Sequence, residues 1–166
     1  LIWNIGTTYW MWNSTDVGSV AAMITNSLLM SVPWLFYFSA AKKNKNIGFF
    51  TLIASWLTFE YIHLNWQISW PWLTLGNGFA MHTSVIQWYE YTGVAGGSLW
   101  ILLMNILVFK LVVAKKEKQP IKKNIVQIVA CFIVPVVCSN IILSYQKTLN
   151  SADTSSPKSE QNVLIV

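Results

Sequence analysis

Four long stretches of this sequence contain no charged residue, and their length and apolar character limit the folds that the chain can adopt. They cover residues 17–41, 47–59, 92–109 and 124–146. A helix needs about 20 apolar residues to cross the roughly 30 Å core of a bilayer. The first and last stretches reach this length, the third nearly does, and the second does so only by running through Glu60 to about Trp66. The pattern predicts an all-α, polytopic transmembrane bundle with spans near residues 17–41, 47–66, 92–113 and 124–145.

The overall composition points to the same environment. Only 10% of the 166 residues are charged and 54% are hydrophobic. A soluble domain carries about 25% charged residues, so most of the outer surface of this chain is expected to face lipid. A nucleic-acid surface would need basic residues on a folded face. The lysines instead occupy short loops at span ends, beside anionic lipid, and no nucleic-acid partner is expected.

Lysine placement orients the predicted spans. The chain has no Arg, and its Lys residues form two main clusters, at 42–45 and 110–123. With four spans these clusters fall on one side, which the positive-inside rule makes cytoplasmic. Both ends of the chain and the connection over residues 65–91 are then expected outside. Seven of the ten Trp residues fall on that outer side, more than interfacial anchoring requires: Trp3, Trp10, Trp12, Trp66, Trp70, Trp72 and Trp88.

We interpret both ends of the sequence as cuts. The chain starts without Met, and a polar segment over residues 147–162 follows the last span. That segment is predicted to be a linker. The apolar, β-branched run at residues 163–166 is typical of a strand. The expected organisation is a transmembrane domain over residues 1–146, the linker, and the first strand of a further domain.

Glu60 is an acid placed near the outer end of the second predicted span. Exposing an acid to lipid is costly, so such a residue usually faces protein or a water-filled cavity. His63 lies on the same helical face, and Asn26, Asn105 and Asn140 add one amide to each of the other spans. Two interpretations stay open: a set of interhelical hydrogen bonds, or a polar patch beneath an outer cavity that orients a headgroup or supports a catalytic domain.

The segment after Glu60 carries no charge before Glu90. Pro71 fixes its own backbone and biases Trp70 toward an extended form. Irregular backbone at membrane depth is tolerated only against protein or a water-lined cavity. The segment therefore either borders a cavity for an amphiphile or acts as an aromatic anchor. The resulting candidates for a lipid site are Glu60, His63, Trp66, Trp70, Pro71, Trp72 and Gly76.

Cys131 and Cys138 are seven residues apart and share one face of the last predicted helix. They cannot form a disulfide within one helix, and neither has the His or acid neighbours of a metal set. An apolar setting leaves a thiol inert. We therefore expect no metal site and treat neither Cys as a nucleophile.

An ordered set of motifs from Glu60 onward resembles the apolipoprotein N-acyltransferase family. That family has a Glu near the outer end of a span, a Pro-Trp-Leu and Leu-Gly turn, a Gln followed by two Gly residues, and an Asn in the next span. The sequence departs from it only in having Trp70 where Phe is common. The resemblance covers essentially the whole chain and adds Gln87 to the candidate site. The matching positions are Glu60, Pro71-Trp72-Leu73, Leu75-Gly76, Gln87, Gly93, Gly96 and Asn105.

The resemblance implies the membrane half of a bacterial inner-membrane enzyme, with both ends of this chain in the periplasm. The family adds a nitrilase-like α/β domain with a Glu–Lys–Cys triad, so the catalytic residues would follow Val166. The Cys takes an acyl chain from phospholipid as a thioester and passes it to the N-terminal diacylglyceryl-cysteine of a lipoprotein. The expected partners are phospholipid, diacylglyceryl-apolipoprotein and the membrane, without a cofactor. This chain alone is expected to bind lipid but to be inactive.

Two other functions stay open from the sequence. A transport or channel module would place Glu60, His63 and the Asn residues along one continuous polar path, although the repeated broken helices of many transporters are lacking. A structural anchor for another outer domain would need neither a polar path nor a lipid cavity.

Overall fold

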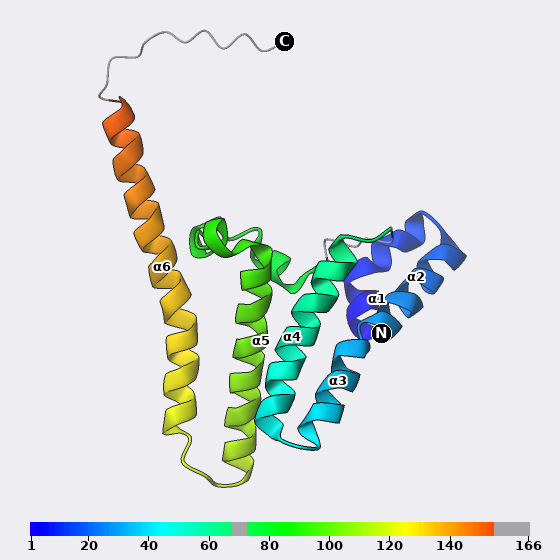
Figure 1. Ribbon diagram of the computed structural model, residues 1–166. Coiled ribbons are helices and arrows are strands. Elements are labelled where there is room, and N and C mark those ends of the chain that lie inside the picture. Colours follow the sequence, from blue (N-terminus) through cyan, green and yellow to red (C-terminus); the bar gives the residue numbers. More distant parts are fainter. Residues whose placement is uncertain (68–72, 155–166) are drawn as a thin grey trace.

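The computed structural model describes residues 1–67 and 73–154, with side chains up to Thr148. Within these residues every regular element is a helix, and four segments are long and apolar enough to cross a membrane. The predicted all-α bundle with four spans is confirmed, and the chain is a multi-pass membrane protein (Figure 1). The four segments are Asp16–Ala41, Lys45–Leu64, Tyr89–Lys116 and Lys122–Thr148.

The first span consists of two helices, α2 (Asp16–Leu29) and α3 (Val32–Ala41). Pro33 lies in the first turn of α3, where its missing N–H breaks no helical bond and its fixed backbone favours a helix start. Continuing α2 through Pro33 would remove a backbone hydrogen bond, so the chain breaks just before it. The short helix α1 (Ile2–Thr8) and the 3-10 helix η1 (Tyr9–Asn13) precede α2 and pack against it.

The helix α4 (Lys45–Leu64) forms a tight antiparallel hairpin with α3. Asn44 caps the start of α4, because its Oδ1 accepts the Asn46 N–H at 2.8 Å. Gly48 lies so close to Ala41 that a Cβ at Gly48 would collide with the Ala41 side chain. Small residues at a helix crossing allow the close approach on which packing in lipid depends.

The helix α5 (Tyr89–Lys116) changes direction near its start. Gly93 has φ +64° within it, a conformation that glycine adopts without steric cost. The segment from Tyr89 to Gly93 is therefore a separate turn that leads into the long membrane-spanning part. The 3-10 helices η3 (Leu75–Phe79) and η4 (Thr83–Val85) precede this turn.

The helix α6 (Lys122–Thr154) contains Pro135 and packs against α5. Pro135 has no N–H to donate to the carbonyl four residues earlier, that of Cys131. Trp100 of α5 fills this gap, because its indole N–H donates to the Cys131 carbonyl at 2.8 Å. A hydrogen bond that α6 cannot make internally thus joins it to α5.

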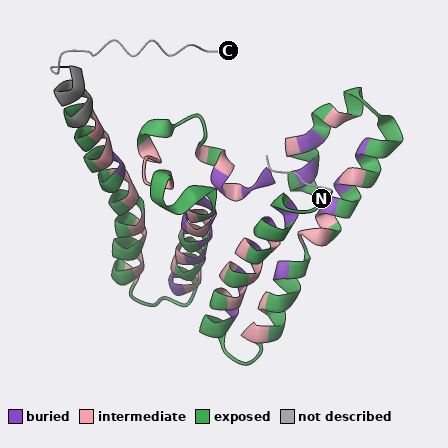
Figure 2. Cartoon of the chain, turned by 45° about the horizontal axis from the view of Figure 1, so that its top comes forward, coloured by how far each residue is buried: buried purple, intermediate pink, exposed green. Residues whose placement is uncertain are grey.

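The two Lys-bearing turns, between α3 and α4 and between α5 and α6, lie together at the lower end of the bundle in Figure 1. The elements η1, η3 and η4 lie at the opposite, upper end. Figure 2 shows that α6 is exposed along most of its length. It also continues as helix to Thr154, into the segment predicted to be a linker. The rest of that linker and the predicted strand at 163–166 lie outside the described residues.

The most deeply buried side chains are small and polar. Five of them are at most 1% exposed: Asn4, Thr8, Ser19, Ser98 and Ser139. Most of the large apolar side chains point outward, as expected where lipid covers the surface. Thr8 and Ser19 bond carbonyls of their own helices, whereas Asn4, Ser98 and Ser139 form hydrogen bonds between elements. The bond of Ser98 helps to position the site described next.

Candidate functional site

Glu60 ties the membrane helix α4 to the loop that leads into η3. Its side chain is 6% exposed, and its Oε1 accepts hydrogen bonds from the Trp56 indole N–H at 3.0 Å and the Leu75 backbone N–H at 2.9 Å. Both donors lie on the same carboxylate oxygen, and the other oxygen, Oε2, is buried without a hydrogen-bond partner. Glu60 therefore organises the loop rather than an exposed surface.

The loop is fixed just as firmly to α5. The Gly76 N–H donates to Ser98 Oγ at 3.0 Å, and the Tyr89 hydroxyl donates to the Gly76 carbonyl at 3.0 Å. Gly76 has no room for a side chain, because a Cβ there would collide with the carbonyl oxygen of Val94. Leu75 and Gly76 together thus join α4 and α5 at the upper end of the bundle.

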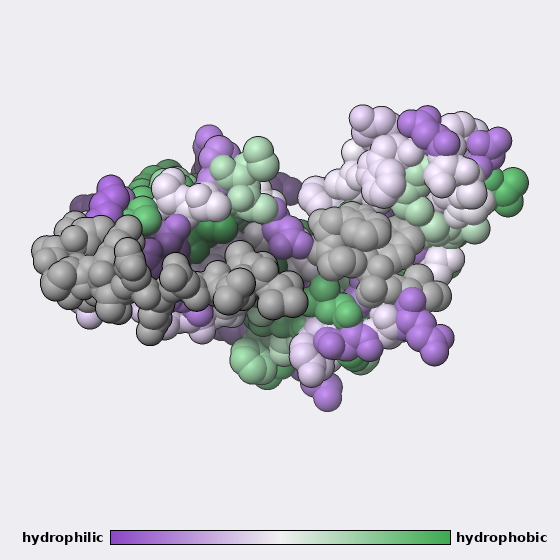
Figure 3. Space-filling model, turned by 90° about the horizontal axis from the view of Figure 1, so that it is seen from above, coloured by the Kyte–Doolittle hydropathy of each residue, from purple (hydrophilic) through white to green (hydrophobic). Residues whose placement is uncertain are grey.

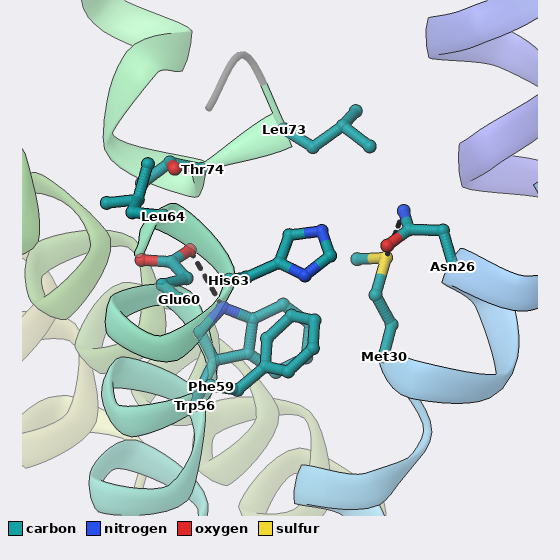
Figure 4. A pocket seen from close by; sticks show the side chains of 9 residues that line it. All are labelled: Asn26, Met30, Trp56, Phe59, Glu60, His63, Leu64, Leu73 and Thr74. Carbon is teal, nitrogen blue, oxygen red and sulfur yellow. Dashed lines mark hydrogen bonds between the residues drawn. The ribbon is translucent and has the colours of Figure 1, made fainter. Parts of the chain in front are cut away.

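His63 and Trp66 continue an aromatic row that starts on α4. His63 stacks on Phe59 with ring centroids 5.1 Å apart and lies 5.2 Å from the Trp66 ring. Its Nε2 is buried without a hydrogen-bond partner. Figure 4 shows the imidazole pointing from α4 toward Asn26 and Met30 of α2.

A small cavity lies among these residues and is called the Glu60 cavity here (Figure 4). Its volume is about 10 Å³, room for a single water-sized group. This cavity is far too small for a lipid headgroup or an acyl chain. Its lining residues are Asn26, Met30, Trp56, Phe59, Glu60, His63, Leu64, Leu73 and Thr74.

The space for a larger ligand lies beside the Glu60 cavity. A groove of about 770 Å³ runs between the α1–α3 side and the α4–α5 side, and we call it the membrane groove. It shares Met30 and Trp56 with the Glu60 cavity. Ligand sites commonly have volumes of about 300–1,000 Å³ and mostly apolar walls. Its lining residues include Trp3, Trp34, Tyr37, Phe49, Leu75, Ile101, Asn105, Ile106 and Phe109.

A second, shorter hollow opens at the upper end and is called the vestibule. It has a volume of about 560 Å³ and lies between α1, η1 and the η3 loop. Trp3 and Leu75 line both the vestibule and the membrane groove. Seen from above (Figure 3), the coloured surface of the molecule mixes residues of intermediate hydropathy with hydrophilic and hydrophobic ones. The vestibule is lined by Trp3, Thr7, Trp10, Leu73, Thr74, Leu75, Asn77 and Gly78.

The sequence-predicted site residues divide into three groups. Glu60, His63, Trp66 and Gly76 are brought together around the top of α4. Gln87 lies elsewhere, between η4 and α5, where its backbone N–H donates to Ser139 Oγ of α6 at 3.1 Å. The predicted residues Trp70, Pro71 and Trp72 lie outside the described residues.

The continuous polar path that a transport or channel module would require is not formed by the described residues. Asn105 and Asn140 are exposed, and each donates its amide to the carbonyl four residues earlier in its own helix, at 2.8 and 2.9 Å. Of the three Asn residues, Asn26 alone makes the interhelical bond that was one interpretation, to Asn4 of α1 at 2.6 Å. Neither Asn105 nor Asn140 lines the Glu60 cavity.

Sequence reasoning missed the small hydroxyl residues that hold the loops. Ser98 binds the η3 loop, and Ser139 accepts from Gln87 and donates to the Val85 carbonyl. A signal for Ser98 was present, because it directly follows Gly96 and Gly97, and a run of small residues in a span favours close approach of another backbone. Ser139 carries no comparable local signal.

The described residues do not assemble a nucleophilic centre around a thiol. Cys131 is half-buried and Cys138 exposed, both on α6. The described part of the chain contains no cluster of three His, Cys, Asp or Glu side chains that would hold a metal ion. What the arrangement offers chemically is a long apolar groove with a more polar opening at one end.

Comparisons with known proteins identify the family that this chain resembles. Residues 1–107 match the family model of the apolipoprotein N-acyltransferase N-terminal domain. The chain is also similar to the apolipoprotein N-acyltransferase of Chlorobaculum tepidum, with 29% identity over 152 residues. That alignment covers 90% of this chain but 28% of the relative, so the chain spans little more than a quarter of its length. No solved structure matches.

Proposed function

The chain belongs to the apolipoprotein N-acyltransferase family, and we propose that it is the membrane portion that presents phospholipid to such an enzyme's catalytic centre. The complete enzyme would move an acyl chain from phospholipid to the N-terminal diacylglyceryl-cysteine of a lipoprotein through a Cys thioester. The family supports acyltransferase activity at this general level. The donor, the acceptor and the thioester are parts of the proposal.

The observation that carries the proposal is that the membrane groove and the vestibule adjoin, since Trp3 and Leu75 line both. An amphiphile needs an apolar channel for its chain and a more polar opening for its headgroup. The groove extends from Trp3, which also lines the vestibule, to Phe49 and Phe109, close to Lys110 at the lower end. Leu75, held by Glu60, lies where the two spaces meet.

The candidate residues then have a supporting role in this proposal. Glu60 and Gly76 hold Leu75 at the junction, and His63 lines the neighbouring Glu60 cavity with Trp66 packed against its ring. None of them carries out the chemistry. The nucleophilic Cys and its partners would belong to a nitrilase-like domain joined through the segment 147–162, and this chain alone would bind lipid without forming an acyl-thioester. The lysine clusters support a bacterial inner-membrane location with the vestibule facing the periplasm.

The groove can be tested with a matched pair of substitutions. Asn105 and Asn140 are both exposed and both bond only their own helix, but Asn105 lines the membrane groove and Asn140 lies on α6, away from it. Asn105→Trp should fill the groove and lower the acyl-enzyme formed by the complete protein at least ten-fold. Asn140→Trp should leave it within two-fold. Intact-mass analysis after incubation with phospholipid measures both.

Equal activity of the two variants, each inserted at the normal level, would overturn the groove as the acyl-chain site. A hydroxylamine-sensitive acyl adduct on Cys131 or Cys138 would instead show that the chemistry itself has been misplaced. The two failures are distinct, because the first leaves the acyl-enzyme on the expected Cys.

A further inference from the structure

A network of hydrogen-bonded polar side chains connects α1 and α2, and it ends at the side-chain oxygen of Asn26. Asn4 donates to Ser27 Oγ at 2.9 Å, and Asn26 donates to Asn4 Oδ1 at 2.6 Å. The Asn26 side chain is 3% exposed, and its Oδ1 is buried without a hydrogen-bond partner. Because the amide nitrogen is already used, this oxygen requires a donor from outside the α1–α2 pair.

The atom that faces it belongs to α4. His63 is 8% exposed, and its Nε2 is likewise buried without a hydrogen-bond partner. Figure 4 shows the imidazole directed at Asn26 and Met30 across the Glu60 cavity. A neutral imidazole with its proton on Nε2 donates one hydrogen bond there. Among the described residues, a donor and an acceptor without partners therefore lie on different helices at the same small cavity, with no direct hydrogen bond between them.

The Glu60 cavity, which both side chains line, has room for a water molecule. The cavity volume of about 10 Å³ is room for one water molecule. A buried water typically makes about three hydrogen bonds. Here it would accept from His63 Nε2–H and donate to Asn26 Oδ1. The Met30 sulfur on the same cavity wall already accepts from the side-chain amides of Asn4 and Asn26, at 3.5 and 3.6 Å.

We propose that one buried water molecule bridges His63 and Asn26 and thereby fastens α2 to α4. The bridge has a structural consequence, because α1, η1 and α2 pack on one another while α3 packs on α4. The membrane groove is lined by residues from both groups, among them Ser27 of α2 and Trp56 of α4. The water therefore helps to hold these two parts of the groove wall together, in addition to satisfying two buried polar groups.

A double-mutant cycle in the complete protein, reconstituted in lipid nanodiscs, tests the bridge. His63→Phe removes the donor and Asn26→Leu the acceptor. The fall in unfolding midpoint of the double variant should be clearly smaller than the sum of the two single falls, because either change alone removes the water. As a control, His63→Phe combined with Asn105→Leu should show additive falls, since Asn105 bonds only its own helix. Additive falls for His63 and Asn26 would overturn the proposal.

A structure of the unaltered protein at a resolution that shows ordered water provides a test independent of folding defects. We expect one density peak within hydrogen-bonding distance of both Asn26 Oδ1 and His63 Nε2. A direct hydrogen bond between these two atoms, or a dry contact between them, would refute the water bridge. Neither outcome depends on the acyltransferase function, so failure here leaves that proposal standing.

Discussion

Single residues in this protein act by satisfying backbone groups that lipid cannot satisfy. Glu60 is the clearest example, because one carboxylate oxygen accepts both the Trp56 indole and the Leu75 backbone N–H. An acid inside a span normally indicates function. Here its direct role is to hold the loop that forms the junction of groove and vestibule, so function depends on it indirectly.

Glu60→Gln and Glu60→Leu should separate the hydrogen bonds from the charge. Gln keeps an oxygen for both donors, whereas Leu leaves two buried donors without an acceptor, at about 1–3 kcal/mol each. We expect Glu60→Leu to lower the thermal unfolding midpoint in detergent markedly and Glu60→Gln to lower it little. Equal losses for the two variants would mean that the carboxylate's charge, and not its acceptor oxygen, is what the fold requires.

Gly76 provides a second residue-level prediction. Its Cβ would collide with Val94, whereas a Cβ at Gly78 in the same 3-10 helix would meet nothing within 4 Å. Gly76→Ala should therefore destabilise the protein by about 1–3 kcal/mol, the usual range for overpacking. Gly78→Ala serves as the control and should be nearly neutral. Chemical unfolding of the two variants measures the difference, and similar stabilities would contradict the close packing of η3 on α5.

At the scale of elements, hydrogen bonds missing from one helix are supplied by another. Pro135 leaves the Cys131 carbonyl of α6 without its helical donor, and Trp100 of α5 supplies one. Trp100 also packs against Phe79, Trp88 and Phe132, with centroids 4.8–6.3 Å away. The indole thus joins η3, the start of α5 and α6, which otherwise has little buried surface.

Trp100 and Pro135 should therefore be coupled energetically. Trp100→Phe keeps most of the ring packing but removes the donor, which we expect to cost about 1–3 kcal/mol. In a Pro135→Ala background the helix supplies its own N–H to Cys131, so the same change should cost clearly less. Trp34→Phe, at a half-exposed site on α3, should cost the same in both backgrounds. Identical costs for Trp100→Phe would show that the indole hydrogen bond is dispensable.

The whole molecule is organised by its two ends. Both lysine-bearing turns lie at the lower end, and η1, η3 and η4 lie at the other (Figure 1). The prediction that the lysine end is cytoplasmic can be tested with single cysteines in a Cys131→Ala, Cys138→Ala background. A membrane-impermeant maleimide applied from the periplasmic side should label Ser84→Cys and should label Lys116→Cys only after permeabilisation. The opposite pattern would invert the topology.

Sequence alone determined the environment, the all-α class and the four spans. These properties depend on the length of uncharged runs and the positions of Lys, and each is local along the chain. It also indicated that Glu60, His63 and Gly76 form part of one region. The break between α2 and α3 has a local signal in Pro33, whereas the helical start of the predicted linker has none.

Only the tertiary structure decided which polar groups meet. Asn26, Asn105 and Asn140 look alike in the sequence, yet Asn26 faces α1 and α4 while the other two bond their own helices. A cavity for an amphiphile was one expectation, but the residues that line the membrane groove were not predicted, because its walls come from helices far apart in the chain. In lipid, apolar side chains are energetically favourable on either face of a helix, whether that face contacts lipid or protein. Hydrophobic pattern therefore does not reveal which face turns inward, and the partners of a few small polar side chains decide it.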